Sequence, residues 1–564
     1  MTKNSTLSHR PPRRFWGWGQ ADAKLDKQEQ ATVKTMAERL DAKFEHRPQP
    51  QTDEFVLPPP RISPPAALAD AFSAMPLDRL NHCAGKSYAD CARMWLREPP
   101  SPPDWVAFPN NEQAIIDILD WAQANNVAVI PYGGGSSVCG GVETAVGESY
   151  AAVVSLDMER MNRVLEVDPI SRAARIQAGA LGPELAAQLK EHQLTLRHFP
   201  QSFEFSTLGG WIVTRAGGHY ATQYTHIDDF VESTRLVTPA GVMQTRRLPG
   251  SGAGPAPDRL VIGSEGTLGV LTEAWVRLQK PPRFRASASV RFTDYFAAAR
   301  CVRALAQSGL NPSNCRLLDV LETVFAGVGN GRHSILVLAF ESDDHPLHAW
   351  MERALELVKD YGGEYDSEAV ARSMSSQGSN EHRSGAAGVW RNAFLRMPYW
   401  RDPLVGLGII LDTFETAITW DRFEDFYTDI KSEVSAAIKR ATGQDILLSC
   451  RLTHLYPDGA APYFTFGTRA ADGTVASALA GWCDIKQAAN EAVVSHGGTI
   501  THHHAVGRDH RSGYEREADP LFVQMLAAAK QVVDPQCVLN PGVLFDPVNR
   551  DVGETGVLAA GKAT

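Results

Sequence analysis

The sequence predicts an α+β protein made of two domains with an extension at each end. The chain has 564 residues, which is more than one hydrophobic core usually organises. From Trp105 to Arg277, stretches with helical and strand periodicity alternate and are separated by glycine-rich loops. From Phe284 to Thr499, helical stretches alternate with β-rich runs. With 43% hydrophobic and 21% charged residues, the composition is that of a globular protein.

Residues 1–100 are predicted to form an N-terminal extension with a helical arm. Prolines at 58–60 and 99–100 mark linkers. The segment from Met1 to Arg14 is basic and polar and lacks the apolar core of a secretory signal. Trp16 and Trp18 form an unusual aromatic patch, for which we prefer packing of the arm onto the main body over a docking surface, because aromatic rings chiefly contribute buried area.

The first glycine-rich loop, Pro131 to Gly141, follows a helix predicted to begin with Asn110 as N-cap and a strand at Val127 to Ile130. Its five glycines and two serines allow backbone N–H groups to converge on a phosphate. No Lys-Ser/Thr pair completes a P-loop, and the glycine spacing does not open a helix as in a dinucleotide-binding turn. Taken alone, the loop is equally consistent with a plain glycine-rich turn.

Two more loops of this kind, at 200–218 and 263–270, strengthen the interpretation of the first loop as a phosphate-binding cradle. Together the three loops resemble the PCMH-type FAD-binding superfamily, the flavoproteins of the vanillyl-alcohol-oxidase type. The resemblance implies FAD bound noncovalently, although Cys139 and His219 are residue types that can attach flavin. It assigns FAD contacts to small and polar loop residues: Pro131, Gly133, Gly134, Gly135, Ser136, Ser137, Gly140, Ser202, Ser206, Thr207, Gly209, Gly210, Thr214, Gly263, Glu265, Gly266, Thr267 and Gly269.

The same resemblance implies a domain organisation. Residues 101–283 would form a two-part PCMH-type FAD-binding domain. Residues 284–499 would form a cap domain with an antiparallel sheet and helices, with helices expected at 295–307 and 348–361 and β-rich runs at 334–340 and 406–411. Residues 500–564 would return to the FAD domain.

Three adjacent histidines, His502, His503 and His504, are the sharpest local signal near the C-terminus. In an extended segment successive side chains point to opposite faces, so at most His502 and His504 could share a metal ion. The spacing is poor for zinc, and no metal ion is predicted. A polar surface strand and an active-site strand whose imidazoles move protons both stay open.

Motifs in the second half narrow the resemblance to the alkyldihydroxyacetonephosphate synthase family. They are Phe414 to Asp421, Cys450 to Tyr456, Tyr463 to Phe466 and His502 to Arg508, and the similarity runs from about Asp78 to the end of the chain. The resemblance implies exchange of the acyl chain of acyl-dihydroxyacetone phosphate for a fatty alcohol, in ether-lipid synthesis, through an adduct at flavin N5 without net redox change.

The resemblance also implies roles for individual residues. Tyr463 and His503 would do acid-base work, and Arg401, His502 and His504 would complete the catalytic set. Substrate contacts would come from Arg316, Arg401 and Arg451, since guanidinium groups bind phosphate oxygens in pairs.

Two departures from the family pattern keep alternatives open. Asn540-Pro541-Gly542 is closer to flavin enzymes that oxidise 2-hydroxy acids, and the sequence from Gly507 to His510 differs from the more basic run expected of the family. The first alternative is therefore an FAD-dependent dehydrogenase or oxidase of a hydroxy acid or alcohol. The second is a noncatalytic flavin-binding assembly subunit.

Charge and cysteine content limit partners and location. A net charge of -10 gives no basic face for nucleic acid. The 8 cysteines are scattered without a Cys-x-x-Cys pair, which indicates reduced thiols and a cytoplasmic protein. A lipid or hydroxy-acid substrate is expected, and the prediction allows peripheral membrane contact and a homodimer.

Overall fold

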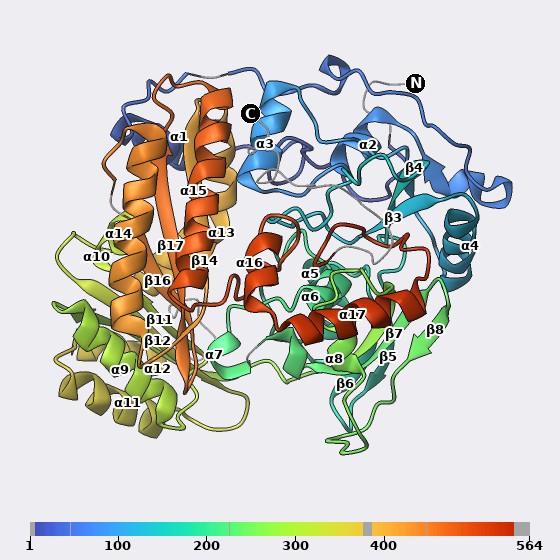
Figure 1. Cartoon of the computed structure of the whole chain (residues 1–564). Helices are drawn as coiled ribbons and strands as arrows, with labels where there is room; N and C mark the ends of the chain where they lie inside the picture. Colours follow the sequence, from blue (N-terminus) through green and yellow to red (C-terminus); the bar gives the residue numbers. More distant parts are fainter. Residues whose placement is uncertain (1–5, 46, 225, 376–385, 447, 546–564) are drawn as a thin grey trace.

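The computed structural model describes residues 6–45, 47–224, 226–375, 386–446 and 448–545. Within them lie three β-sheets: a four-stranded and a five-stranded sheet, which together carry the glycine-rich loops, and an eight-stranded sheet. We call the first two, with their helices, the glycine-loop domain, and the third, with its helices, the cap domain. Figure 1 shows the cap domain, coloured yellow-green to orange, beside the glycine-loop domain. The predicted α+β class with two-part first domain and antiparallel cap is confirmed.

The four-stranded sheet has the order β1-β2-β4-β3. Its β2, β4 and β3 run parallel, and β1 pairs with β2 in the antiparallel sense. The strands are β1 (Phe72–Ser73), β2 (Trp105–Ala107), β3 (Val127–Tyr132) and β4 (Ala152–Asp157). Helix α4 (Glu112–Ala124) covers the sheet with Ile115, Ile118 and Leu119. The N-cap is Asn111 rather than the predicted Asn110, because the Asn111 side chain accepts the N–H of Ala114.

The five-stranded sheet is antiparallel, with the order β5-β6-β9-β7-β8. Its strands are β5 (Val164–Asp168), β6 (Ala173–Gln177), β7 (Val231–Thr238), β8 (Gly241–Gln244) and β9 (Val270–Arg277). Contacts to this sheet come from the short helices α5 (Gly182–Lys190), α6 (Leu208–Val213) and α8 (Asp258–Val261), whereas α7 (Ala221–Tyr224) contacts strands of the cap domain. Thr207 caps α6 by accepting the N–H of Gly210, which places the second glycine-rich loop at a helix start.

The cap sheet is antiparallel in every pairing and has the order β13-β10-β12-β11-β16-β17-β14, with β15 beside β17. Its strands are β10 (Phe284–Phe292), β11 (Asn314–Leu318), β12 (Ser334–Ser342), β13 (Glu364–Tyr365), β14 (Ile409–Glu415), β15 (Ile418–Thr419), β16 (Ser449–Leu455) and β17 (Gly459–Arg469). Its helices are α9 (Tyr295–Gln307), α10 (Val320–Phe325), α11 (His348–Asp360), α12 (Ser367–Ser375), α13 (Ala386–Val405), α14 (Phe423–Thr442) and α15 (Val475–Ser495). The predicted helices near 295–307 and 348–361 are confirmed as α9 and α11.

The N-terminal arm runs across both domains before α1 (Lys27–Arg39), α2 (Pro76–Asn81) and α3 (Tyr88–Leu96). Phe15, Trp16 and Trp18 are each less than a tenth exposed. Trp16 packs edge-on against Trp95, and Trp18 against Phe205. The preferred prediction, an arm packed on the main body, is therefore confirmed, and a docking patch at these rings is excluded by their burial.

The last described segment returns to the glycine-loop domain through α16 (Arg511–Glu517) and α17 (Pro520–Val533), which crosses the front of that domain in Figure 1. Val129 of β3 donates its N–H to Val538 and accepts that of Asn540. Within the described residues, no helix combines the length and apolar character needed to cross a membrane.

Candidate active site

One cavity lies where the three glycine-rich loops meet the cap domain. Its wall includes most of the predicted cofactor residues: Pro131, Gly133, Gly134, Gly135, Ser136, Ser137, Ser202, Ser206, Thr207, Gly209, Gly210, Thr214, Glu265, Gly266 and Gly269. From the cap and the C-terminal segment come Arg316, Arg401, Tyr463, His503 and His504. Residues far apart in sequence therefore border one cavity.

Close packing between loops explains why the cradle needs glycine. A Cβ at Gly134 would overlap the backbone carbonyl of Phe205, and one at Gly133 would overlap the hydroxyl of Thr207. Gly135 has φ +63°, a conformation that side chains disfavour. The first loop can therefore lie against the second only without side chains, which leaves its backbone open to a phosphate-bearing cofactor. The cavity wall fits a dinucleotide such as FAD in this respect.

Glu265 connects the third loop to the histidine segment. Its carboxylate accepts the N–H of Val506 at 2.9 Å and of Gly507 at 2.8 Å. Burial raises the pKa of Glu265 to about 7, although these two N–H groups favour the charged form. Asn540 donates to the carbonyl oxygens of Glu265 and Gly141, so the C-terminal segment also ties the first loop to the third.

The histidine segment is wrapped around one buried carboxylate, Glu415, at the end of β14. Glu415 accepts the backbone N–H groups of His502, His503 and His504 at 2.8, 3.2 and 3.0 Å, and the hydroxyl of Thr501 at 2.5 Å. Burial alone would raise the pKa of Glu415, but the attraction of His503 and His504 holds it well below its usual value. The segment is a bend and not the predicted strand, because three successive N–H groups converge on one carboxylate.

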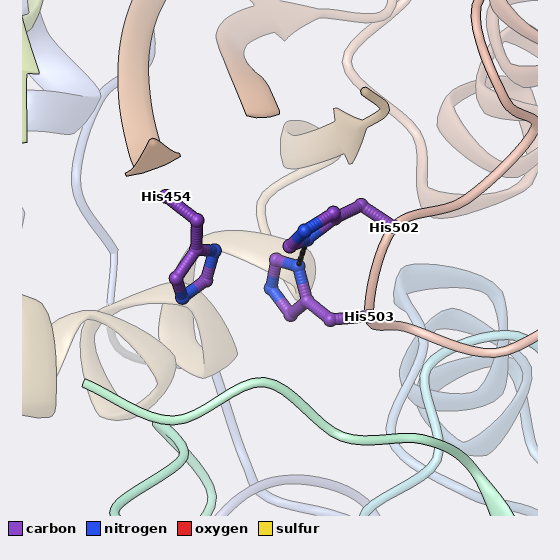
Figure 2. Close-up of side chains that lie close together, drawn as sticks. All are labelled: His454, His502 and His503. Atoms are coloured by element: carbon purple, nitrogen blue, oxygen red, sulfur yellow. Dashed lines mark hydrogen bonds between the residues drawn. The ribbon is translucent and has the colours of Figure 1, made fainter. Parts of the chain in front are cut away.

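The bend changes which histidines face each other. Nitrogens of His454, His502 and His503 all lie within 4.8 Å of one another, whereas extended backbone would have separated His502 from His503. Figure 2 shows these three rings turned toward each other, with a hydrogen bond of 2.9 Å between the Nδ1 atoms of His502 and His503. The prediction that only His502 and His504 could share a ligand is therefore wrong.

Burial keeps most of these imidazoles neutral. It is the main cause that lowers the pKa of His454 and His502 well below the usual value, with neighbouring histidines adding to the effect. Burial also lowers the pKa of His504 to about 3, although Glu415 opposes the shift. Neutral imidazoles can accept a proton from a substrate carbon or alcohol.

Tyr463 reaches the cavity from β17, beside the β14 edge of the cap sheet, and lies directly opposite Glu415 in the β14–β17 register. Its hydroxyl lies 2.9 Å from that of Thr413. The guanidinium of Arg451 lies 3.9 Å from the centre of the Tyr463 ring. Burial raises the pKa of Tyr463, and Arg451 acts against that shift. The phenol therefore stays protonated near neutral pH and can donate a proton.

Four cationic side chains line the cavity: Lys86, Arg316, Arg401 and Lys486. Arg401 donates to the carbonyl of Lys86 at 2.9 Å, while its buried Nε has no hydrogen-bond partner among the described residues. Burial and the neighbouring Arg451 lower the pKa of Arg316 to about 9. A buried cluster of this charge favours an anionic ligand.

Among the described residues, five of the predicted site residues do not line the cavity. Four of them are Gly140, Gly263, Thr267 and His502. The fifth, Arg451, is 1% exposed, forms an ion pair with Glu322 at 2.6 Å and lies over the Tyr463 ring, which does line the cavity. Its direct contact with the substrate stays a prediction.

Sequence reasoning missed Trp18, Lys86, His454 and Lys486, all of which line the cavity. Lys86 donates to the carbonyls of Arg14 and Phe15, and Lys486 to that of Thr413. Neither lysine lies in a recognisable motif. Buried lysines are rare, and this rarity could have identified both as candidate site residues, but a sequence does not show which lysines are buried.

The fold and site define a class of protein: a flavoprotein built from two known domains. Residues 103–246 match the family described as "FAD binding domain", and residues 281–544 match "FAD linked oxidases, C-terminal domain". In agreement, the structure resembles p-cresol methylhydroxylase with a TM-score of 0.65 at 14% identity, over 93% of this chain and 99% of that one. FAD is therefore the cofactor.

More specific relatives are alkyldihydroxyacetonephosphate synthases. The enzyme of Trypanosoma brucei brucei is 30% identical over 83% of this chain and 77% of its own length. That of Dictyostelium discoideum is 28% identical over 86% and 80%, respectively. A solved alkyldihydroxyacetonephosphate synthase superposes with a TM-score of 0.77 at 24% identity, covering 94% of this chain and 98% of that one. The chain belongs to the alkyldihydroxyacetonephosphate synthase family.

Proposed function

We propose that this FAD-dependent enzyme exchanges the acyl chain of acyl-dihydroxyacetone phosphate for a fatty alcohol. The observation that carries the proposal is the meeting of proton-transfer groups and buried cations in one cavity with the glycine cradle. Tyr463, His503 and His504 supply the first, and Arg316 and Arg401 belong to the second. A 2-hydroxy acid carries one negative charge, whereas a phosphate monoester carries about −1.5 to −2 near pH 7, so the buried cations suit the phosphate ester better.

Each group has a task in such an exchange. Arg401 binds the substrate phosphate, because its Nε is buried and lacks a partner among the described residues. Arg316, also buried in the cavity wall, adds positive charge. A neutral histidine accepts the proton lost from the substrate, and the Tyr463 hydroxyl donates a proton to the departing carboxylate. FAD, when bound, supplies the electron sink that lets one oxygen substituent leave and another enter.

We further propose that FAD is held without a covalent bond. Cys139 does not line the cavity and donates its thiol to the carbonyl of His504 at 3.1 Å. His219 lines the cavity, but its Nε2 lies 3.0 Å from the amide nitrogen of Asn314. After acid precipitation the yellow colour is expected in the supernatant, and colour retained in the pellet would refute noncovalent binding.

The activity is tested with purified protein, acyl-dihydroxyacetone phosphate and a long-chain alcohol. We expect fatty acid to be released while the flavin is oxidised at the end of the reaction. Stable bleaching of the flavin by 2-hydroxy acids, without fatty-acid release, would instead identify the dehydrogenase alternative. Protein that binds FAD but does neither would identify the assembly-subunit alternative.

Variants assign the roles. Tyr463→Phe should lower kcat by about 100-fold or more, the usual contribution of a positioned acid. His503→Asn and His504→Asn compared side by side show which imidazole accepts the proton.

Arg401→Lys should raise KM more than it lowers kcat, since a lysine replaces a planar fork by a single point charge. Tyr150→Phe is the matched control, because Tyr150 donates its hydroxyl to the Cys537 carbonyl, outside the cavity wall.

A homodimer, peripheral membrane contact and a cytoplasmic location stay predictions. Each rests on the expected lipid substrate or on composition. Light scattering, vesicle flotation and cell fractionation would test them separately.

A further inference from the structure

A second group of hydrogen-bonded residues begins behind His503 and leads away from the cavity. The Nδ1 of His503 is 2.9 Å from the Nδ1 of His502. The Nε2 of His502 is 2.8 Å from the hydroxyl of Tyr456 and 3.1 Å from the Nε2 of His226. The Tyr456 hydroxyl and the His226 Nε2 are themselves 3.1 Å apart. Three imidazoles and a phenol therefore form one continuous network.

The network joins two environments. His503 lines the cavity, whereas His502, Tyr456 and His226 do not. The His502 side chain is only 5% exposed. Tyr456 and His226 are partly exposed although neither belongs to the cavity wall. The network therefore runs from the cavity wall to two partly exposed side chains outside that wall.

We propose that His502, with Tyr456 and His226 as two parallel branches, is a proton relay that returns His503 to its neutral state through solvent outside the cavity. The proposal rests on the proposed function in that His503 is the group that receives the substrate proton. A bound lipid substrate would fill the cavity and block direct exchange of protons with water. The proton on His503 would then need a second route to solvent.

The proton transfers along the relay leave the charge of each of its residues unchanged. A proton arrives on His503 Nε2, and the Nδ1 proton of His503 passes to His502 Nδ1. His502 then gives its Nε2 proton to the Tyr456 oxygen or directly to His226 Nε2. In the first case Tyr456 releases its original hydroxyl proton to water, and in the second case His226 releases its Nδ1 proton to water. No electrons move. Each imidazole ends as its other tautomer, and a proton that passes back along the same path restores the starting tautomers.

Charges around the network suit a passing imidazolium. Glu415 lies 3.2 Å from His503 Nδ1 and 4.0 Å from His502 Nδ1. Asp228 and Arg215 act on His226 from the other side and have opposite effects on its charge. A neutral imidazole has a lone pair on one ring nitrogen only; in the starting tautomer of the relay this is the Nδ1 of His502, which already accepts the hydrogen bond from His503, while its Nε2–H donates to Tyr456 or His226. This favours a relay over a cation site at the same rings.

The decisive experiment uses the double variant Tyr456→Phe/His226→Asn, since either single variant leaves one branch intact. Each single variant should lower kcat less than about threefold. The double variant should lower it about tenfold or more, within the usual range of acid-base effects, with KM nearly unchanged. Added imidazole should restore the rate of the double variant, because a small buffer can replace a missing proton carrier. Tyr150→Phe/His192→Asn is the matched control.

Full activity of the double variant, or a loss that imidazole does not restore although flavin absorbance is normal, would overturn the relay. Nitrogen-15 NMR of labelled histidines gives a readout that does not need turnover. The relay predicts a hydrogen-bonded Nδ1 in both His502 and His503 and a shifted His502 Nε2 signal in the double variant. Absence of this shift, or stoichiometric bound zinc, would refute the relay even if the wild-type protein releases no fatty acid. Missing fatty-acid release by itself refutes only the proposed function.

Discussion

Single buried residues set both the chemistry and the stability of this protein. Glu415 is the best example, because one carboxylate fixes the backbone of three histidines and also faces their rings. In a strand, these successive side chains would have pointed to opposite faces. Because Glu415 accepts their backbone N–H groups, His502 and His503 instead lie on the same side, together with His454.

His198 provides a pH-dependent prediction at this scale. Its ring is 2% exposed, lies against Trp211 and Phe230, and has an Nε2 without a partner among the described residues. Burial lowers its pKa to about 3, whereas an unfolded histidine has a pKa near about 6.5. Between these values the unfolded chain binds a proton that the folded chain does not, so stability falls as pH falls.

We therefore expect His198→Phe to weaken the acid destabilisation of the protein. The unfolding free energy of the wild type should lose about 1.4 kcal/mol per pH unit from His198 below about pH 6. Urea unfolding midpoints between about pH 5 and about pH 7 measure the slope. Replacement of the exposed His192 is the control, and an identical slope in both variants would contradict the prediction.

At the scale of elements, the glycine-rich loops hold the cofactor site together because they pack closely against neighbouring backbone. Gly134→Ala should separate the first two loops, because its Cβ would overlap the Phe205 carbonyl and backbone cannot turn aside as a side chain can. We expect the variant to fold with reduced FAD content, measured as the ratio of flavin to protein absorbance. Gly252→Ala is the control, since a Cβ there meets no atom within 4 Å. Equal FAD content in the two variants would show that the contact is dispensable.

The N-terminal arm is an element whose role follows from its partners. The backbone N–H of Trp18 donates to the buried Asp402 at 2.6 Å, and Arg13 donates to the Gly134 carbonyl at 2.6 Å. Gly17 permits the approach, because a Cβ there would overlap the Asp402 carboxylate. The arm thus joins the first glycine-rich loop to α13, the helix that carries Arg401.

Trp18→Ala should destabilise the protein by about 3–5 kcal/mol, the usual cost of removing a buried tryptophan. It should also alter FAD fluorescence, because Trp18 lines the cavity. Denaturant unfolding and flavin emission measure the two effects. Trp350→Ala, at a ring that is 37% exposed, should change neither greatly. A Trp18 variant as stable as the Trp350 variant would disprove this account.

At the scale of the whole molecule, the cofactor site is the joint between distant parts of the chain. Loops from the glycine-loop domain, strands of the cap and the C-terminal segment all border one cavity. A ligand that binds only the folded arrangement stabilises all of them by mass action.

Removal of FAD should therefore lower the thermal midpoint of the entire chain, and adding FAD back should restore it in proportion to the logarithm of its concentration. At about a hundredfold excess over Kd the gain is about 2.7 kcal/mol. Differential scanning fluorimetry of stripped and reloaded protein measures it, with the Gly134→Ala variant as a protein expected to gain less. A midpoint that does not respond to FAD would contradict a cofactor at this joint.

Much of the fold and part of the site could be predicted from local patterns in the chain. Periodicity placed α9, α11 and β12, and the loops from Gly133 to Gly269 predicted the cradle. Local patterns were insufficient where a residue's role depends on its neighbours in space. Arg451 lies in a matching motif yet pairs with Glu322, and Lys86 lies in no motif yet lines the cavity.

The sequence by itself determined the class of protein, because glycine spacing, hydrophobic periodicity and motif order are local properties written along the chain. Only the tertiary structure decided which histidines meet, which arginines face the cavity and what the N-terminal tryptophans do. The physical reason is that these outcomes depend on contacts across hundreds of residues. Glu415 turns a segment 87 positions away in sequence, as its bond to the His502 N–H shows, and no local pattern encodes that encounter.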